Sequence, residues 1–169
     1  MILLEGANCN LHSYVREESK KDLLYDLWKC MEMDGDSDKL LWAYDKSDLV
    51  QFILCFADPN VLFFTVYNKD YSEYVGFVWL HEIKPGFKCH TGIYIRKKYR
   101  KQLTDEAGKL ILDFAFDKLN LKEIWGHTPW ENVRKSGERS GFKEVAVLPN
   151  HIIIKGVPHN YYISVLKKE

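Results

Sequence analysis

The spacing of hydrophobic positions changes several times along the chain, and each change marks a predicted element. Near the start, and again after residue 47, apolar residues recur every three or four positions, as on the buried face of an amphipathic helix. Between residues 61 and 96 they form short runs rich in aromatic and β-branched residues, which is typical of strands. The full pattern predicts helices at 17–33, 47–56, 104–119 and 132–139, and strands at 61–67, 74–80, 88–96, 123–128, 142–148, 152–155 and 161–166.

Turn residues between these elements predict how the strands pair. Short turns at 68–70 and 85–86 join three consecutive strands, which favours an antiparallel meander. The helix at 104–119 separates two strands, and such a crossover implies a parallel pair. We therefore predict an α+β fold with a mixed, mostly antiparallel sheet flanked by helices. Residues at the element ends support these bounds: Ser19 and Thr104 as N-caps, Asn120 and Gly141 as helix stops, and 34–38 as a solvated acidic loop.

Length and charge narrow the class of protein. With 169 residues, of which 14% are aromatic, the chain can bury a sizeable core, and we expect one domain over residues 1–169. Lysine plus arginine and aspartate plus glutamate both number 24, so the formal net charge is zero. This balance argues against bulk attraction to nucleic acid or to an anionic membrane, although a local basic patch can still bind an anion.

The cysteines and the hydropathy pattern bear on the compartment. No apolar run approaches the ~20 residues that a bilayer crossing needs, and residues 1–6 lack the basic start of a signal peptide. The cysteines form no C-x-x-C pair, which indicates reduced, buried thiols rather than a disulfide framework or a metal site. We therefore expect a cytoplasmic protein without a metal or a membrane partner. The four cysteines are Cys9, Cys30, Cys55 and Cys89.

The segment 93–107 carries the clearest candidate chemistry. An apolar strand runs into a basic turn, and the turn opens directly into an amphipathic helix. A helix start after a strand presents free backbone N–H groups and a positive dipole end, which is how proteins commonly hold phosphate. The turn could equally contact a nucleic-acid backbone, or be a solvated turn. Its five cations are Arg96, Lys97, Lys98, Arg100 and Lys101.

Three features together resemble the GNAT family, the Gcn5-related N-acetyltransferases, over about residues 61–166. The first is this strand, basic turn and helix, which corresponds to the acetyl-CoA motif of the family. The second is the helix end and following strand at 114–124. The third is Asn132 followed by Gly141 and Phe142, which resembles the family's asparagine, short helix and Gly-Phe strand entry.

The resemblance implies which residues bind acetyl-CoA as co-substrate. Matching Arg100 to the first motif residue places Leu103 and Asp105 where the family has glycines. Ile95, with Ile93 beside it, is implied to offer backbone N–H groups to the reacting carbonyl. The full implied set is Ile93, Ile95, Arg100, Lys101, Gln102, Leu103, Thr104 and Asp105 around the turn, and Asn132 near the pantetheine arm.

Acetylation of an amine also needs a base, because the amine must lose a proton before it attacks. His90, on the strand leading into the motif, and His127, at the end of strand 123–128, are candidates, since an unperturbed histidine titrates near 6.5. Each also has a plainer interpretation, as a half-buried strand residue or as a loop residue beside a proline. Glu82 and His81, after the preceding strand, are further candidates for a relay through water.

We therefore predict an N-acetyltransferase that acts on a small-molecule or protein amine, with Trp42 and Tyr44 as candidate substrate contacts. Two alternatives remain open. The motif glycines are absent and the helix after Asn132 has no tyrosine, so the chain could be a non-catalytic binding or structural component of the phage or mobile-element type. The basic turn could instead serve a nucleic-acid-modifying relative, which we favour less. Tyr161 and Tyr162 are candidates for pairing two copies in a homodimer.

Overall fold

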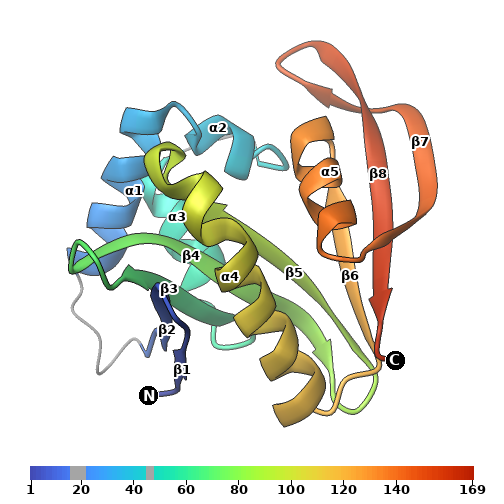
Figure 1. Cartoon of the computed structure of the whole chain (residues 1–169). Helices are drawn as coiled ribbons and strands as arrows, with labels where there is room; N and C mark the ends of the chain where they lie inside the picture. Colours follow the sequence, from blue (N-terminus) through green and yellow to red (C-terminus); the bar gives the residue numbers. More distant parts are fainter. Residues whose placement is uncertain (16–21, 45–47) are drawn as a thin grey trace. The chain divides into compact units, whose positions relative to one another are not determined.

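The computed structural model describes residues 1–15, 22–44 and 48–169. The described strands form one sheet of eight in the order β1-β2-β3-β4-β5-β6-β8-β7 (Figure 1). The predicted α+β class and mostly antiparallel sheet are confirmed, and β5 and β6 form the predicted parallel pair. The chain divides into two compact units, residues 1–81 with 92–111 and residues 82–91 with 112–169.

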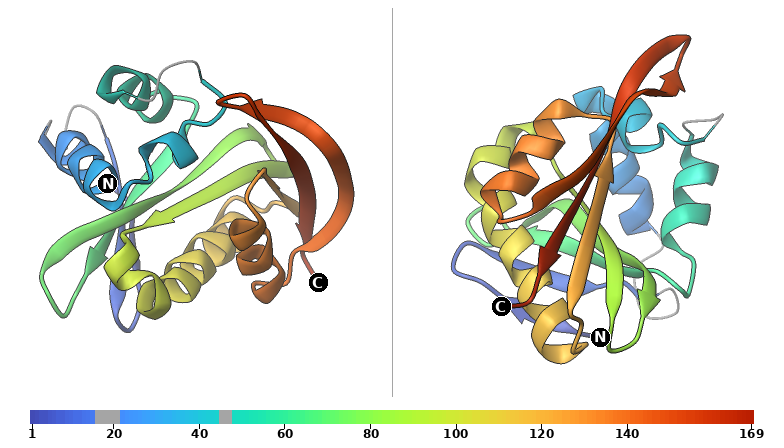
Figure 2. Two further views of the ribbon diagram at one scale, coloured as in Figure 1. Left: turned by 90° about the horizontal axis from the view of Figure 1, so that it is seen from above. Right: turned by 90° about the vertical axis from the view of Figure 1, so that its right-hand side faces the viewer.

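The first unit places helices on both faces of its strands. Figure 2 shows α1 and α3 on one face and α4 on the other. Leu103, Ala107 and Ile111 form the buried stripe of α4. The elements are β1 (Leu3–Glu5), β2 (Cys9–Ser13), α1 (Asp22–Asp34), α2 (Ser37–Leu40), α3 (Leu49–Phe56), β3 (Leu62–Asn68), the larger part of β4 (Glu73–Lys84), the end of β5 (Lys88–Ile95), a 3-10 turn (Lys97–Tyr99) and most of α4 (Arg100–Asp113).

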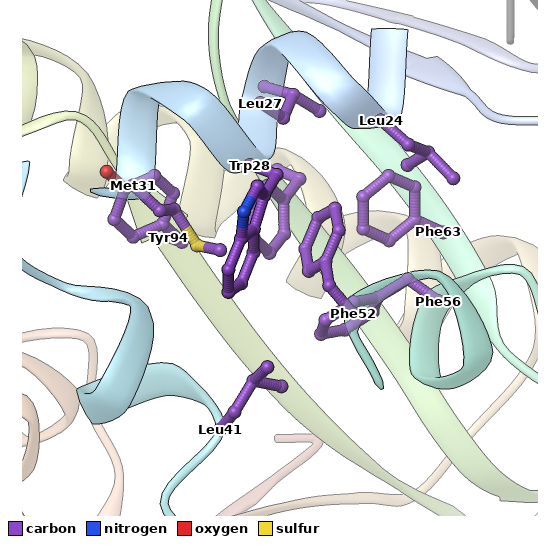
Figure 3. Packing of buried hydrophobic residues seen from close by; sticks show 10 residues of the cluster. Leu24, Leu27, Trp28, Met31, Leu41, Phe52, Phe56, Phe63 and Tyr94 are labelled. Carbon is purple, nitrogen blue, oxygen red and sulfur yellow. The ribbon is translucent and has the colours of Figure 1, made fainter. Parts of the chain in front are cut away.

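An aromatic cluster fills the space between α1, α3 and the strands of this unit (Figure 3). Phe52 of α3 is fully buried, with its ring centroid 5.7 Å from that of Trp28 and 5.5 Å from that of Phe77. β5 comes close to Trp79 of β4, because a Cβ atom at Gly92 would lie 2.0 Å from the indole ring. The buried members are Leu24, Leu27, Trp28, Met31, Leu41, Phe52, Phe56, Phe63, Phe77 and Tyr94.

The second unit is built on β6 and a long C-terminal hairpin (Figure 1). β8 pairs antiparallel with both β6 and β7, so it lies between them. Gly141 adopts a positive φ of 94° after the last helix, as predicted for a helix stop. The elements are the end of β4, the start of β5, a π-helical stretch (Phe114–Lys118), β6 (Glu123–Thr128), α5 (Glu131–Arg139), β7 (Lys143–Ile154) and β8 (Val157–Lys167).

Several predicted bounds are wrong, each for a local reason. The helix predicted at 104–119 begins at Arg100, so Thr104 lies inside it and is no N-cap. The strands predicted at 142–148 and 152–155 are one strand, β7, whose register shifts between Leu148 and Ile152. β1 and β2 escaped prediction because they are short, and the predicted loop 34–38 contains the start of α2. The predicted helix starts at Ser19 and near Ser47 lie outside the described residues.

Candidate functional site

In the first unit, the last residue of α1 contacts the end of β5 and the basic turn that follows it. The carboxylate of Asp34 accepts hydrogen bonds from the Tyr94 hydroxyl at 3.0 Å and from the backbone N–H of Lys97 at 2.8 Å. Burial, together with the charge of Asp34, raises the pKa of Tyr94, so its hydroxyl stays a donor at neutral pH. One amide at the start of the helical segment is therefore already occupied by an anionic group of the chain itself.

Arg100 is also engaged within the first unit. Its guanidinium pairs with Asp36, whose side chain is only 6% exposed, and its Nε donates to the Ile95 carbonyl at 2.9 Å. The acidic segment predicted to be a solvated loop is thus a structural partner of the basic turn. The opposite charges of the two segments are consistent with a contact between them. Because the segments lie far apart along the chain, the sequence alone did not predict which residues pair.

The remaining residues predicted to bind acetyl-CoA differ in their exposure. Lys101, Gln102 and Asp105 are exposed, Thr104 is half-buried, and the Leu103 side chain is buried in the core. Since α4 begins at Arg100, the amides of Thr104 and Asp105 lie at positions where an α-helix uses N–H groups for its own hydrogen bonds. A helix leaves only the N–H groups of its first turn available. Here the 3-10 turn Lys97–Tyr99 leads directly into α4, and its Tyr99 N–H already donates to the Arg96 carbonyl at 2.8 Å.

In the second unit, the structure brings the two predicted histidines together. His90 of β5 pairs in register with Trp125 of β6, which puts His127 two residues further along the neighbouring strand. Their ring centroids are 4.6 Å apart. Glu82 joins this group, with its carboxylate 3.6 Å from Nε2 of His90. Histidine and carboxylate side chains in such contact can hold and transfer a proton.

His127 has a further partner on β8 that sequence reasoning did not connect to it. Its Nδ1 lies 3.1 Å from the hydroxyl oxygen of Tyr161. Its Nε2 is buried and has no hydrogen-bond partner among the described residues. Burial, followed by the charges of His90 and Lys88, lowers the pKa of His127 below its ordinary 6.5, so its imidazole is neutral at neutral pH.

A cavity of about 620 Å³ lies in the same unit, at the start of α5. Asn132, predicted beside the cofactor, is exposed and lines it. Trp130 and His159 form a wall, with their ring centroids 5.2 Å apart. The lining residues are Pro129, Trp130, Glu131, Asn132, Lys135, Pro158, His159, Asn160 and Tyr162.

Family comparison identifies the chain. The family model described as acetyltransferase (GNAT) domain matches residues 18–143, which is most of the sequence. The chain belongs to the GNAT acetyltransferase family. It is accordingly an acyltransferase of the N-acetyltransferase type. A search among curated proteins finds no match.

Solved structures show the same fold at low sequence identity. A GCN5-related N-acetyltransferase from Brucella melitensis superposes with a TM-score of 0.76 at 20% identity, over 98% of this chain and 78% of that one. A ribosomal-protein-alanine acetyltransferase from Vibrio fischeri gives 0.75 at 16% identity, over 100% and 98% of the two chains. A spermidine N-acetyltransferase from Vibrio cholerae, solved with CoA and spermine, gives 0.74 at 20% identity, over 95% of each.

The remaining predictions concern substrate contacts, a metal and a membrane crossing. Trp42 and Tyr44 lie in the loop between α2 and α3 of the first unit, with Trp42 half-buried and Tyr44 exposed. Among the described residues, no three His, Cys, Asp or Glu side chains are arranged to hold a metal ion. In residues 1–15, 22–44 and 48–169, no helix combines the length and apolar character that a membrane crossing requires.

Proposed function

We propose that this GNAT protein transfers the acetyl group of acetyl-CoA to a primary amine, with His127 as the base. The observation that carries the proposal is the contact of His127 with His90 in the second unit. A base must be unprotonated at working pH, and the lowered pKa of His127 meets that requirement. The orphaned Nε2 of His127 is the atom that we assign to the proton transfer.

The positive charges at the start of α4 complement the negative charges of the acetyl-CoA phosphates. Lys97, Lys98 and Lys101 are exposed cations beside the first turn of a helix, where unpaired amides favour anions. When bound, acetyl-CoA supplies the thioester whose acetyl group is transferred. The engagement of Arg100 with Asp36 and the burial of Leu103 leave the lysines and first-turn amides as the better candidates for binding.

The acceptor class follows from the chemistry of the base. A neutral imidazole can deprotonate an alkylammonium ion, so we propose a small-molecule or protein amine as acceptor. Solved relatives of similar fold include a spermidine and a ribosomal-protein acetyltransferase, which is consistent with either class. We also propose that residues 1–169 act as one acyltransferase domain, because the family model spans residues of both units. A cytoplasmic location and a homodimer stay predictions.

Thiol release and calorimetry test the proposal. Titration with CoA should give heat of binding, and a panel of polyamines and peptide amines should release CoA thiol from acetyl-CoA. We expect His127→Gln to lower kcat by roughly 100-fold or more, as for loss of a general base, with CoA affinity retained. His12→Gln is the matched control, because His12 also contacts a tyrosine hydroxyl at 3.1 Å but lies in the first unit on β2. Absence of both CoA binding and thiol release would reject the function.

A further inference from the structure

We infer that Tyr161 is a positioning residue that holds His127 in the tautomer with a free lone pair on Nε2. The inference rests on the proposed role of His127 as the base. β6 and β8 pair so that His127 is opposite Ile163, which leaves Tyr161 as the diagonal neighbour of His127 on the same face. The hydroxyl oxygen of Tyr161 lies 3.1 Å from Nδ1, and the two rings meet edge to face.

The two ends of the His127 ring decide which nitrogen carries the proton. A neutral imidazole has one N–H, and the hydrogen bond at one nitrogen fixes the form of the other. Nε2 is buried without a partner among the described residues, and a buried N–H left unpaired is rarer and more costly than an unpaired acceptor. Nδ1–H therefore donates to the Tyr161 oxygen, and Nε2 keeps its lone pair.

The surrounding charges suit this arrangement. Burial, followed by the charge of Glu82, raises the pKa of Tyr161, so the phenol stays neutral and its oxygen can accept from Nδ1–H at working pH. His151 of β7 also stacks on the Tyr161 ring, with centroids 6.1 Å apart. The titratable groups around His127 and Tyr161 are Glu82 of β4, Lys88 and His90 of β5, and His151 of β7.

The proton then follows one route. The Nε2 lone pair of His127 takes a proton from the substrate ammonium, which leaves a neutral amine and an imidazolium whose Nδ1–H still donates to Tyr161. The amine nitrogen forms the C–N bond to the acetyl carbon, and the C–S bond breaks. A second proton passes from that nitrogen to the departing thiolate to give the CoA thiol. His127 finally releases its proton to water, so one proton is produced per turnover.

Nitrogen NMR of the full chain tests the tautomer without any need for turnover. The ¹⁵N shifts of His127 should show a protonated Nδ1 and an unprotonated Nε2 in the wild type. Tyr161→Phe removes the acceptor oxygen and should shift His127 toward the Nε2–H form, which is the form that histidine favours in water. A wild-type Nε2–H form, or the same tautomer in both proteins, would overturn the inference.

Kinetics supply the second readout. Tyr161→Phe should lower the plateau of kcat roughly two- to ten-fold, the range expected for one neutral hydrogen bond, with KM for acetyl-CoA unchanged.

Tyr74→Phe is the matched control, because Tyr74 makes the same 3.1 Å contact with Nδ1 of His12 in the first unit. It should alter neither kcat nor the His127 spectrum. An unchanged kcat in Tyr161→Phe would contradict the positioning role. A wild type without turnover would remove the proposed function, while the spectra would still decide the tautomer.

Discussion

At the scale of single residues, burial and the neighbouring charges together set the pH range over which His127 can act as a base. Its pKa is lowered first by burial and then by His90 and Lys88, whereas Glu82 raises it. A base is lost when it is protonated, so kcat/KM should fall as pH drops through the pKa of His127, at a midpoint below about 6.5.

Two neighbouring charges should move this midpoint in opposite directions. Lys88→Gln removes a cation and should shift the acid limb of the kcat/KM profile to higher pH. Glu82→Gln removes an anion that stabilises the imidazolium and should shift it to lower pH. The ionisation of the amine substrate also affects the profile, but its contribution is the same for both variants when the same amine is used. Shifts in the same direction would contradict His127 as the titrating group.

The sequence was sufficient to name His90 and His127 as candidate bases, because residue type and position on a predicted strand can both be read locally. It could not connect Tyr161 to them. That contact depends on the register between β6 and β8, which long-range pairing sets over a separation of 34 residues. The pairing of Asp36 with Arg100 was hidden for the same reason, across 64 residues.

At the scale of elements, periodicity predicted the type of most helices and strands but not all their ends. The stripe of α4 was evident, but Thr104 with acidic residues after it resembled a helix start. Arg100, Lys101 and Gln102 are polar and add nothing to an apolar period, so the first turn was missed. β1 and β2 have three and five residues, too few to establish a pattern against the surrounding chain.

Alanine substitution of two glycines, one in β5 and one in α4, should change the free energy of unfolding in opposite directions. Gly92→Ala in β5 would press a Cβ atom into the Trp79 ring, so we expect a loss of about 1–3 kcal/mol in the free energy of unfolding. Gly108→Ala in α4 meets nothing within 4 Å and should add about 0.5–1 kcal/mol through helix propensity. Urea unfolding of both variants measures this, and equal effects would contradict the packing of β5 on Trp79.

At the scale of the whole molecule, long-range contacts rather than local signals join distant parts of the chain. The carboxylate of Glu106 in α4 accepts hydrogen bonds from the backbone N–H and the side-chain amide of Asn8, both at 2.8 Å, across 98 residues. It thereby ties the turn between β1 and β2 to the helix that follows the basic turn. Nothing in the local sequence around Asn8 or Glu106 predicts this contact.

This tie should make the stability of the fold depend on acid pH. Burial alone would raise the pKa of Glu106, but the hydrogen bonds from Asn8 and Cys9 outweigh it and lower that pKa below its ordinary 4.5. A carboxyl with a lowered folded-state pKa stabilises the fold above pH 4.5, and this contribution is lost as pH falls through the lowered value.

Glu106→Gln should therefore lower the free energy of unfolding by about 1 kcal/mol near neutral pH and by less in acid, as measured by urea unfolding at several pH values. Asp105→Asn, which removes an exposed carboxylate one residue earlier, is the control for the loss of one negative charge from α4. If the free energy of unfolding fell equally in Glu106→Gln and in the wild type on acidification, the Glu106–Asn8 contact would not contribute to the loss of stability in acid.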